Sequence, residues 1–347
     1  SMAEVVEYEF DIGSKQINIT GSSGTALAID NQIPAPTVRA SVGDTLRATF
    51  HNRLDVATSV HWHGILLPGD QDGVPYLNTQ PIGPGDSHTF EFPITHAGTF
   101  WYHSHTDLQI QKGLYGAVVL SEKHEHSQLE DRVVLFSDWT DESVSLVLRN
   151  LKSDDEYYSF KRGTTQSWSQ VLANGPEAIR NRFDSSFSRM GPMDLADVGY
   201  DAFLVNGETE NSISDLAADS AQVKLRLING STSSYCDVEY AGGPMTIVAA
   251  DGVDVQPITV DKQRIAIAET FDVLVTLPND GKAYEFRASS EDGTGFSTAL
   301  LGSGEVVAAP VLPKPDPFAV DHSSHQMADG NHGMNHHSAH KNFVDSH

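Results

Sequence analysis

Two histidine pairs, each with one residue between its members, are the part of the sequence best suited to chemistry. His61 and His63 lie in "HWHG", and His103 and His105 lie in "WYHSH". Side chains two residues apart in a β-strand point to the same face, so each pair would project together. If the two strands are neighbours, four imidazoles converge. Neutral imidazole binds copper, zinc or iron, and a set without thiolate or carboxylate favours borderline metals such as copper.

The alternative explanation is a coincidence of surface histidines. Two such pairs, each within aromatic and Gly-rich strand sequence, make that explanation the less favoured one. The aromatic residues beside the pairs are interpreted as packing residues of a β-sandwich; they are Trp62, Trp101 and Tyr102. The unpaired histidines nearby are interpreted as surface residues; they are His51, His88, His96, His124 and His126.

The segments that carry the pairs have the pattern of β-strands. Residues 1–124 contain short alternating or apolar runs such as "VVEYEFDIG", "TSVHWHGIL" and "YGAVVLS", separated by turn signals such as "GSSG" and "PIGPGD". This spacing predicts an antiparallel β-sandwich with Greek-key connections. The histidine pairs therefore belong to a first all-β domain.

A second β-sandwich domain is predicted over residues 125–313, where the strand pattern resumes. It contains a helical insertion at about 140–197, because Val144, Val147, Leu148 and Leu151 recur with helical spacing. The apolar positions from Trp168 to Met190 continue that pattern, and we interpret them as packing faces.

Residues 314–347 change in character and form a His/Met-rich tail or linker with few core-forming residues. Such a segment is expected to be disordered without a ligand. Its imidazoles suit Cu(II) and its thioethers suit Cu(I), so a natural copper-collecting segment is preferred over a purification remnant or a plain linker. Its candidate metal ligands are His322, His325, Met327, His332, Met334, His336, His337 and His340.

Composition limits the remaining classes of function. The formal net charge of −25 disfavours nucleic acid as a partner, because phosphate binding needs a basic face. No run approaches the roughly 20 apolar residues that a membrane-spanning helix needs. The single cysteine, Cys236, excludes an internal disulfide and has no flanking histidine, so we interpret it as a small apolar strand residue.

Longer motifs resemble the multicopper oxidases. "HWHGILLPGDQDGVP" followed by "GTFWYHSHTDLQIQKGLYGAVVL" is similar to their first cupredoxin domain. The likeness continues through "VVLFSDWTDE", "MGPMDLADVGYDAFLVNG", "LRLINGS" and "MTIVAADG", and it is strongest to the periplasmic copper-resistance type. The resemblance implies two cupredoxin-like sandwiches, copper as cofactor, dioxygen as partner and a periplasmic location.

The resemblance also implies a role for each matching residue. His61 would bind a type 2 copper, His63 and His103 one copper of a type 3 pair, and His105 the other. Asp72 in "QDGVP" matches an acid that assists proton delivery to reduced dioxygen; a plain turn aspartate before a glycine is the alternative. The chain would hold half of the ligands of the trinuclear copper cluster.

The family's last domain carries the type 1 copper site and the other ligands of the cluster, and neither motif occurs in this sequence. We therefore expect a missing third cupredoxin domain or a natural two-domain form, no type 1 copper and little activity from the chain alone. An oligomer is possible. The family reaction would couple oxidation of Cu(I) or phenol-like substrates to the reduction of dioxygen to water, in copper resistance. A copper-sequestering protein without turnover and a structural cupredoxin pair without metal remain as alternatives.

Overall fold

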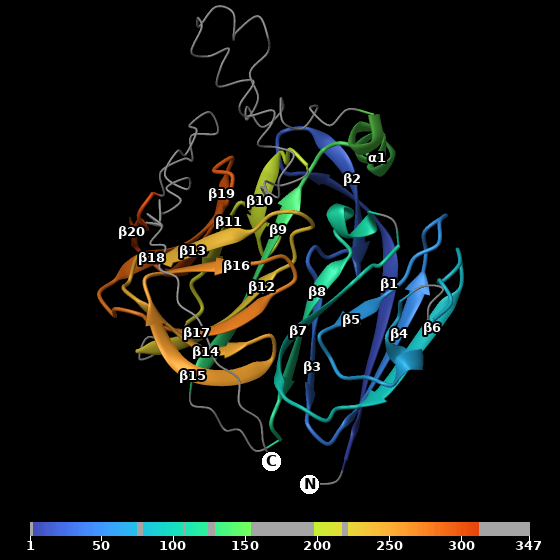
Figure 1. Cartoon of the computed structure of the whole chain (residues 1–347), viewed down its shortest axis with the longest axis horizontal. Helices are drawn as coiled ribbons and strands as arrows, with labels where there is room; N and C mark the ends of the chain where they lie inside the picture. Colours follow the sequence, from blue (N-terminus) through green and yellow to red (C-terminus); the bar gives the residue numbers. More distant parts are fainter. Residues whose placement is uncertain are drawn as a thin grey trace, which may run out of the picture.

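Two β-sandwiches lie side by side in the computed structural model (Figure 1). The structure describes residues 3–74, 79–106, 108–123, 129–153, 198–216 and 221–311. The predicted all-β fold class is confirmed. The predicted His/Met-rich tail, most of the helical insertion, His124 and His126 lie outside the described residues.

The first sandwich packs two four-stranded sheets, in the strand orders β2-β1-β4-β6 and β3-β8-β7-β5. Its elements are β1 (Val5–Asn18), β2 (Ser23–Ile29), β3 (Ala35–Ser41), β4 (Thr45–Asn52), β5 (His61–His63), the 3₁₀ turn η1 (Gly69–Gln71), β6 (Ser87–Pro93), β7 (Gly98–His103), the 3₁₀ turn η2 (Gln109–Lys112) and β8 (Tyr115–Ser121).

The second sandwich packs the sheets β10-β9-β12-β17-β14-β15 and β11-β19-β18-β13-β16, with β20 beside β18. Its elements are β9 (Glu130–Trp139), α1 (Val144–Ser153), β10 (Ala202–Val205), β11 (Glu210–Ile213), β12 (Gln222–Asn229), β13 (Cys236–Tyr240), β14 (Met245–Ala250), β15 (Val253–Val260), β16 (Lys262–Ile265), β17 (Thr270–Thr276), β18 (Lys282–Ser290), β19 (Phe296–Gly302) and β20 (Glu305–Val307).

The predicted antiparallel pairing holds for most strand pairs but not for all of them. β1 runs parallel to β4, β3 to β8, β9 to β12 and β11 to β19, so the sheets are mixed. The alternation of apolar and polar residues reports which face of a strand is buried, but it carries no information about the direction of a neighbouring strand. Direction follows from long connections that cross between the two sheets of a sandwich.

Helical spacing did identify α1, which spans Val144–Ser153 and buries Val147 completely. The predicted strand "TSVHWHGIL" is shortened to the three residues of β5. Each sandwich has its own apolar core; the core of the first includes Phe50, Trp62 and Tyr102. No helix among the described residues is long and apolar enough to cross a membrane.

The two sandwiches are joined by a polar network and by close backbone packing. Arg226 of β12 donates to Thr99 of β7 and pairs with the carboxylates of Asp131 and Asp272. Thr99 donates in turn to Asp272 at 2.6 Å. These buried bonds fix β7, the strand that carries His103, against the second sandwich.

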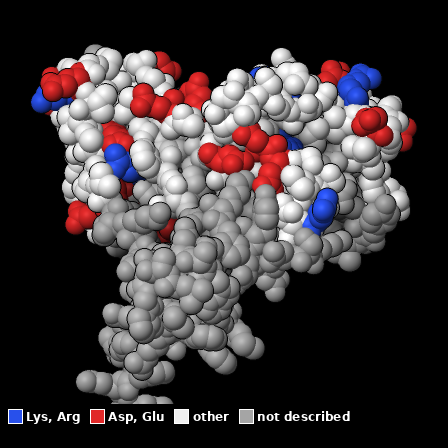
Figure 2. Space-filling model, turned by 90° about the horizontal axis from the view of Figure 1, so that it is seen from above, with Lys and Arg blue, Asp and Glu red and all other residues white. Residues whose placement is uncertain are grey.

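The surface carries the negative charge expected from the sequence. Figure 2 shows clusters of Asp and Glu on the face seen from above, where Lys and Arg occur as isolated patches. The absence of a nucleic-acid partner stays a prediction.

Candidate metal centre

Strands β5 and β7 are antiparallel neighbours, which brings the two sequence motifs together. In their register His61 lies opposite His103, and His63 lies opposite Trp101. These four side chains share one face of the sheet, because alternate residues of a strand share a face. Trp62 lies on the other face and packs into the sandwich core. The convergence expected from the spacing is therefore present in the structure.

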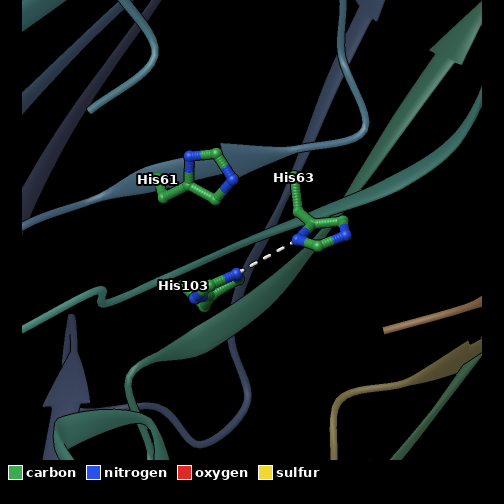
Figure 3. A group of neighbouring side chains, drawn as sticks. All are labelled: His61, His63 and His103. Atoms are coloured by element: carbon green, nitrogen blue, oxygen red, sulfur yellow. Dashed lines mark hydrogen bonds between the residues drawn. The ribbon is translucent and has the colours of Figure 1, made fainter. Parts of the chain in front are cut away.

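Three imidazoles form the centre of this face (Figure 3). One ring nitrogen each from His61, His63 and His103 lie within 4.8 Å of one another. The ring centroid of His61 is 5.6 Å from that of His63 and 5.3 Å from that of His103. Among the described residues this is the one group of three or more His, Cys, Asp or Glu with ligand atoms so close.

His105 is near this group but outside it. It follows the end of β7 and is exposed, and its ring centroid lies 5.7 Å from that of His61 and 6.2 Å from that of His103. Ser104 between the two histidines is buried, as expected for a residue on the opposite side. His105 therefore lies beside the three-imidazole group without being part of it.

Backbone carbonyls fix the tautomers of two of the rings. Nδ1 of His61 donates to the carbonyl oxygen of Asp72 at 2.8 Å, and Nδ1 of His103 donates to the carbonyl oxygen of Ser104 at 2.8 Å. A carbonyl can only accept, so each Nδ1 carries the proton and each Nε2 keeps a lone pair. This outer bond is the arrangement that orients an imidazole for metal binding.

The third ring completes the donor set. Nδ1 of His63 lies 3.4 Å from Nε2 of His103, and the dashed line in Figure 3 marks this contact. Because Nε2 of His103 holds a lone pair, Nδ1 of His63 is the donor in the metal-free chain. A metal that bound both nitrogens would replace that proton.

Burial favours the neutral form of His63 and His103. Desolvation lowers the pKa of His103 from 6.5 to about 3. Desolvation, followed by repulsion from His61, also lowers the pKa of His63. Neutral imidazoles with free lone pairs are what a copper ion requires, so the residues fit the metal that the sequence pattern indicates.

Asp72 lies at the edge of the group, at the end of η1. Its carboxylate is 3.3 Å from Nδ1 of His61, in addition to the bond from that nitrogen to its carbonyl. Gly73 makes this approach possible: its φ is +79°, and a Cβ there would lie 1.7 Å from the carbonyl oxygen of Val60. The turn therefore places the carboxylate of Asp72 close to the ring of His61.

Several other sequence assignments can now be placed. Cys236 is buried in β13, and burial raises the pKa of its thiol, in agreement with its interpretation as a small apolar residue. Trp62 and Tyr102 are packing residues of the first sandwich, as predicted.

Three of the unpaired histidines that the sequence assigns to the surface are only partly exposed. His51, His88 and His96 are half-buried, and Nε2 of His88 and of His96 is buried without a hydrogen-bond partner among the described residues. His88 packs on Phe90, and His96 packs on Phe100. The rings of His88 and His96 thus contact aromatic neighbours. The sequence spacing did not indicate these contacts.

Trp101 is the residue of the site that sequence reasoning missed. It was assigned to sandwich packing, but it lies on the histidine face, with its ring centroid 4.3 Å from that of His103. The signal was available, because Trp101 precedes His103 by two residues and shares its strand face.

Comparison with known families gives two matches along the chain. Residues 11–125 and residues 130–304 each match a multicopper oxidase family.

Among curated proteins, copper resistance protein A of Escherichia coli is 40% identical over 95% of this chain and 56% of its own length. Its homologue from Pseudomonas syringae pv. tomato is 39% identical over 96% of this chain and 57% of its own length. The chain thus spans about half the length of these relatives.

Solved structures share the fold. The structure of Fet3p, described as a multicopper oxidase that functions in iron import, superposes with a TM-score of 0.68 at 20% identity, over 92% of this chain and 56% of that one. A multicopper oxidase from Pseudomonas thermotolerans superposes with a TM-score of 0.64 at 23% identity, over 90% of this chain and 66% of that one.

Proposed function

The chain belongs to the multicopper oxidase family, and from that premise we propose that it is the copper-binding portion of an oxidase that acts in copper resistance. His61 would hold a type 2 copper, His63 and His103 one copper of a type 3 pair, and His105 the other. The observation that carries the proposal is the group of three imidazoles whose ligand nitrogens lie within 4.8 Å of one another.

The residues around the histidine group each have a role in this proposal. The carbonyl acceptors hold Nδ1 of His61 and of His103, so that Nε2 of each ring would be free to bind a copper ion. Asp72 keeps a carboxylate 3.3 Å from Nδ1 of His61, where it can hold or pass a proton. Bound copper would supply the one-electron chemistry that links an oxidised substrate to dioxygen.

The reaction proposed for the whole protein oxidises Cu(I) or a phenol-like substrate and reduces dioxygen to water. Four imidazoles leave each of three coppers with only one or two protein ligands, too few for tight binding of all three. A further segment or another subunit would supply the remaining ligands and the type 1 copper through which electrons enter. The proposed location is the periplasm, and the proposed division of the chain is at residues 124/125 and 313/314.

Copper titration tests the binding part of the proposal. The parent chain is compared with a variant in which His61, His63, His103 and His105 are replaced by Ala, and with a His51→Ala control. Both comparisons are repeated after removal of residues 314–347, which form a second proposed copper-binding segment. We expect the four-histidine variant to lose one to two tightly bound ions in either background, and the control to lose none. Equal uptake by the parent and the four-histidine variant would end the proposal.

Two further measurements separate the alternatives. Oxygen consumption with Cu(I) distinguishes an oxidase from a copper-sequestering protein, and we expect little or none from this chain alone. Metal analysis after copper loading distinguishes a sequestering protein from a structural sandwich pair. Absorption near 600 nm, the signature of type 1 copper, is expected to be absent, because Cys236 is buried in β13 away from the histidine group.

A further inference from the structure

Trp101 contacts two of the proposed ligands through the face of its indole. Its ring centroid lies 4.3 Å from that of His103, at an interplanar angle of 33°. The corresponding values to His63 are 5.2 Å and 34°. The indole is therefore tilted only modestly from both imidazole planes and packs on the two rings whose nitrogens are 3.4 Å apart.

The second sandwich packs against this indole away from the imidazoles. Trp101 is 2% exposed and clusters with Leu135 of β9 and Ile228 of β12. A Cβ placed on Gly230 would lie 3.7 Å from the benzene ring of the indole, so the backbone of the second sandwich reaches it directly. Trp101 thus contacts both the second sandwich and the histidine face.

A cavity lies beside His63 and Trp101. The cavity measures about 270 Å³ and is lined by residues of both sandwiches, including His63, Trp101, Asp251 and Thr270. Since His63 borders open space there, packing does not confine its ring on that side. The indole packs on the ring of His63, and without it we expect His63 to rotate towards the cavity.

The unpaired indole nitrogen does not by itself distinguish Trp101. Nε1 of Trp101 is buried and has no hydrogen-bond partner among the described residues, and the same is true of Nε1 of Trp62 in the core of the first sandwich. What distinguishes Trp101 is its contact with the imidazoles of His63 and His103.

We propose that Trp101 is a positioning residue of the copper site, whose indole holds the imidazoles of His63 and His103 in the orientation that makes their nitrogens converge. The second sandwich packs on the indole. Its packing therefore sets the ligand geometry in the first sandwich. The proposal rests on the proposed function for the identity of the metal, but the orientation is a property of the metal-free chain.

The test compares Trp101→Leu and Trp101→Met, which remove the aromatic face, with Trp101→Phe, which keeps one. Trp62→Leu is the matched control, because Trp62 is equally buried on the opposite face of the same strand pair. Two variants without an aromatic ring are made, because the test needs only one of them to fold. Thermal unfolding is recorded for all four variants.

The first readout is NMR of the metal-free chains. Cross-relaxation between the ring protons of His63 and His103, together with the ¹⁵N shifts of their ring nitrogens, reports on orientation and tautomer. We expect the inter-ring signal to be lost in the Leu and Met variants and kept in the Phe variant and in the Trp62 control.

The second readout is copper affinity per folded molecule. We expect a loss of roughly tenfold without the aromatic face, the low end of the range for lost outer-shell partners, with altered copper electron paramagnetic resonance parameters. The Phe variant should recover most of the affinity. Unchanged inter-ring signals and affinity in the Leu or Met variant would overturn the proposal, as would equal losses in the Trp62 control.

Failure of the proposed function gives a different result. In that case the parent and the four-histidine variant would take up equal amounts of copper, whatever residue occupies position 101. The NMR readout needs no metal and would still decide whether Trp101 positions the rings.

Discussion

Acidification of the metal-free chain should reduce its stability through His103. The unfolded chain binds a proton at this residue with a pKa near 6.5, whereas burial lowers the pKa in the folded chain to about 3. Between these values the unfolded state holds more protons, so stability falls as the pH falls. One pKa unit corresponds to about 1.4 kcal/mol, so His103 should remove about 2 kcal/mol between pH 7 and pH 5.

Urea unfolding in the presence of a chelator measures this contribution. The parent is compared with His103→Gln, which cannot titrate, at pH 7 and at pH 5. The parent should lose about 2 kcal/mol more than the variant, because the other ionisable groups are common to both chains. An identical pH dependence for the parent and His103→Gln would show that His103 is not desolvated, and the argument for a neutral ligand set would fail.

Three other substitutions test the structure around the site. Gly252→Ala should destabilise the chain by about 2–4 kcal/mol in thermal unfolding, since its Cβ would lie 2.2 Å from an aromatic ring of the first sandwich. Gly281→Ala should cost less, because Gly281 has a similar φ but no atom close to its added Cβ. Equal effects of the two substitutions would contradict the steric argument. Arg226→Met should cost about 3 kcal/mol in urea unfolding by removing the buried cation that pairs with Asp131 and Asp272, and a neutral result would show that the network is solvated. Asp72→Asn should leave unfolding nearly unchanged, because the carbonyl bond to His61 remains; a large loss would show that the carboxylate itself orients the ring.

The sequence by itself determined which residues could bind metal and which strand faces they occupy. A period of two residues is a local property, so the shared face of His61 and His63 follows from the chain alone. The same alternation identified the all-β class and the restart in the second half, and the helical spacing of apolar residues, also a local pattern, identified the helix at Val144–Ser153. The motifs around the histidines carried the family resemblance, which the family matches confirm.

Only the tertiary structure decided how those faces meet. Pairing of β5 with β7 places His61 opposite His103, and this register depends on strands far apart in sequence rather than on alternation within either one. The same pairing puts Trp101 on the histidine face, and the docked second sandwich buries it there. Parallel strand pairs, the carbonyl partners of the ring nitrogens and the lowered pKa of His103 also depend on long-range packing. Desolvation and register are properties of neighbours that local sequence does not specify.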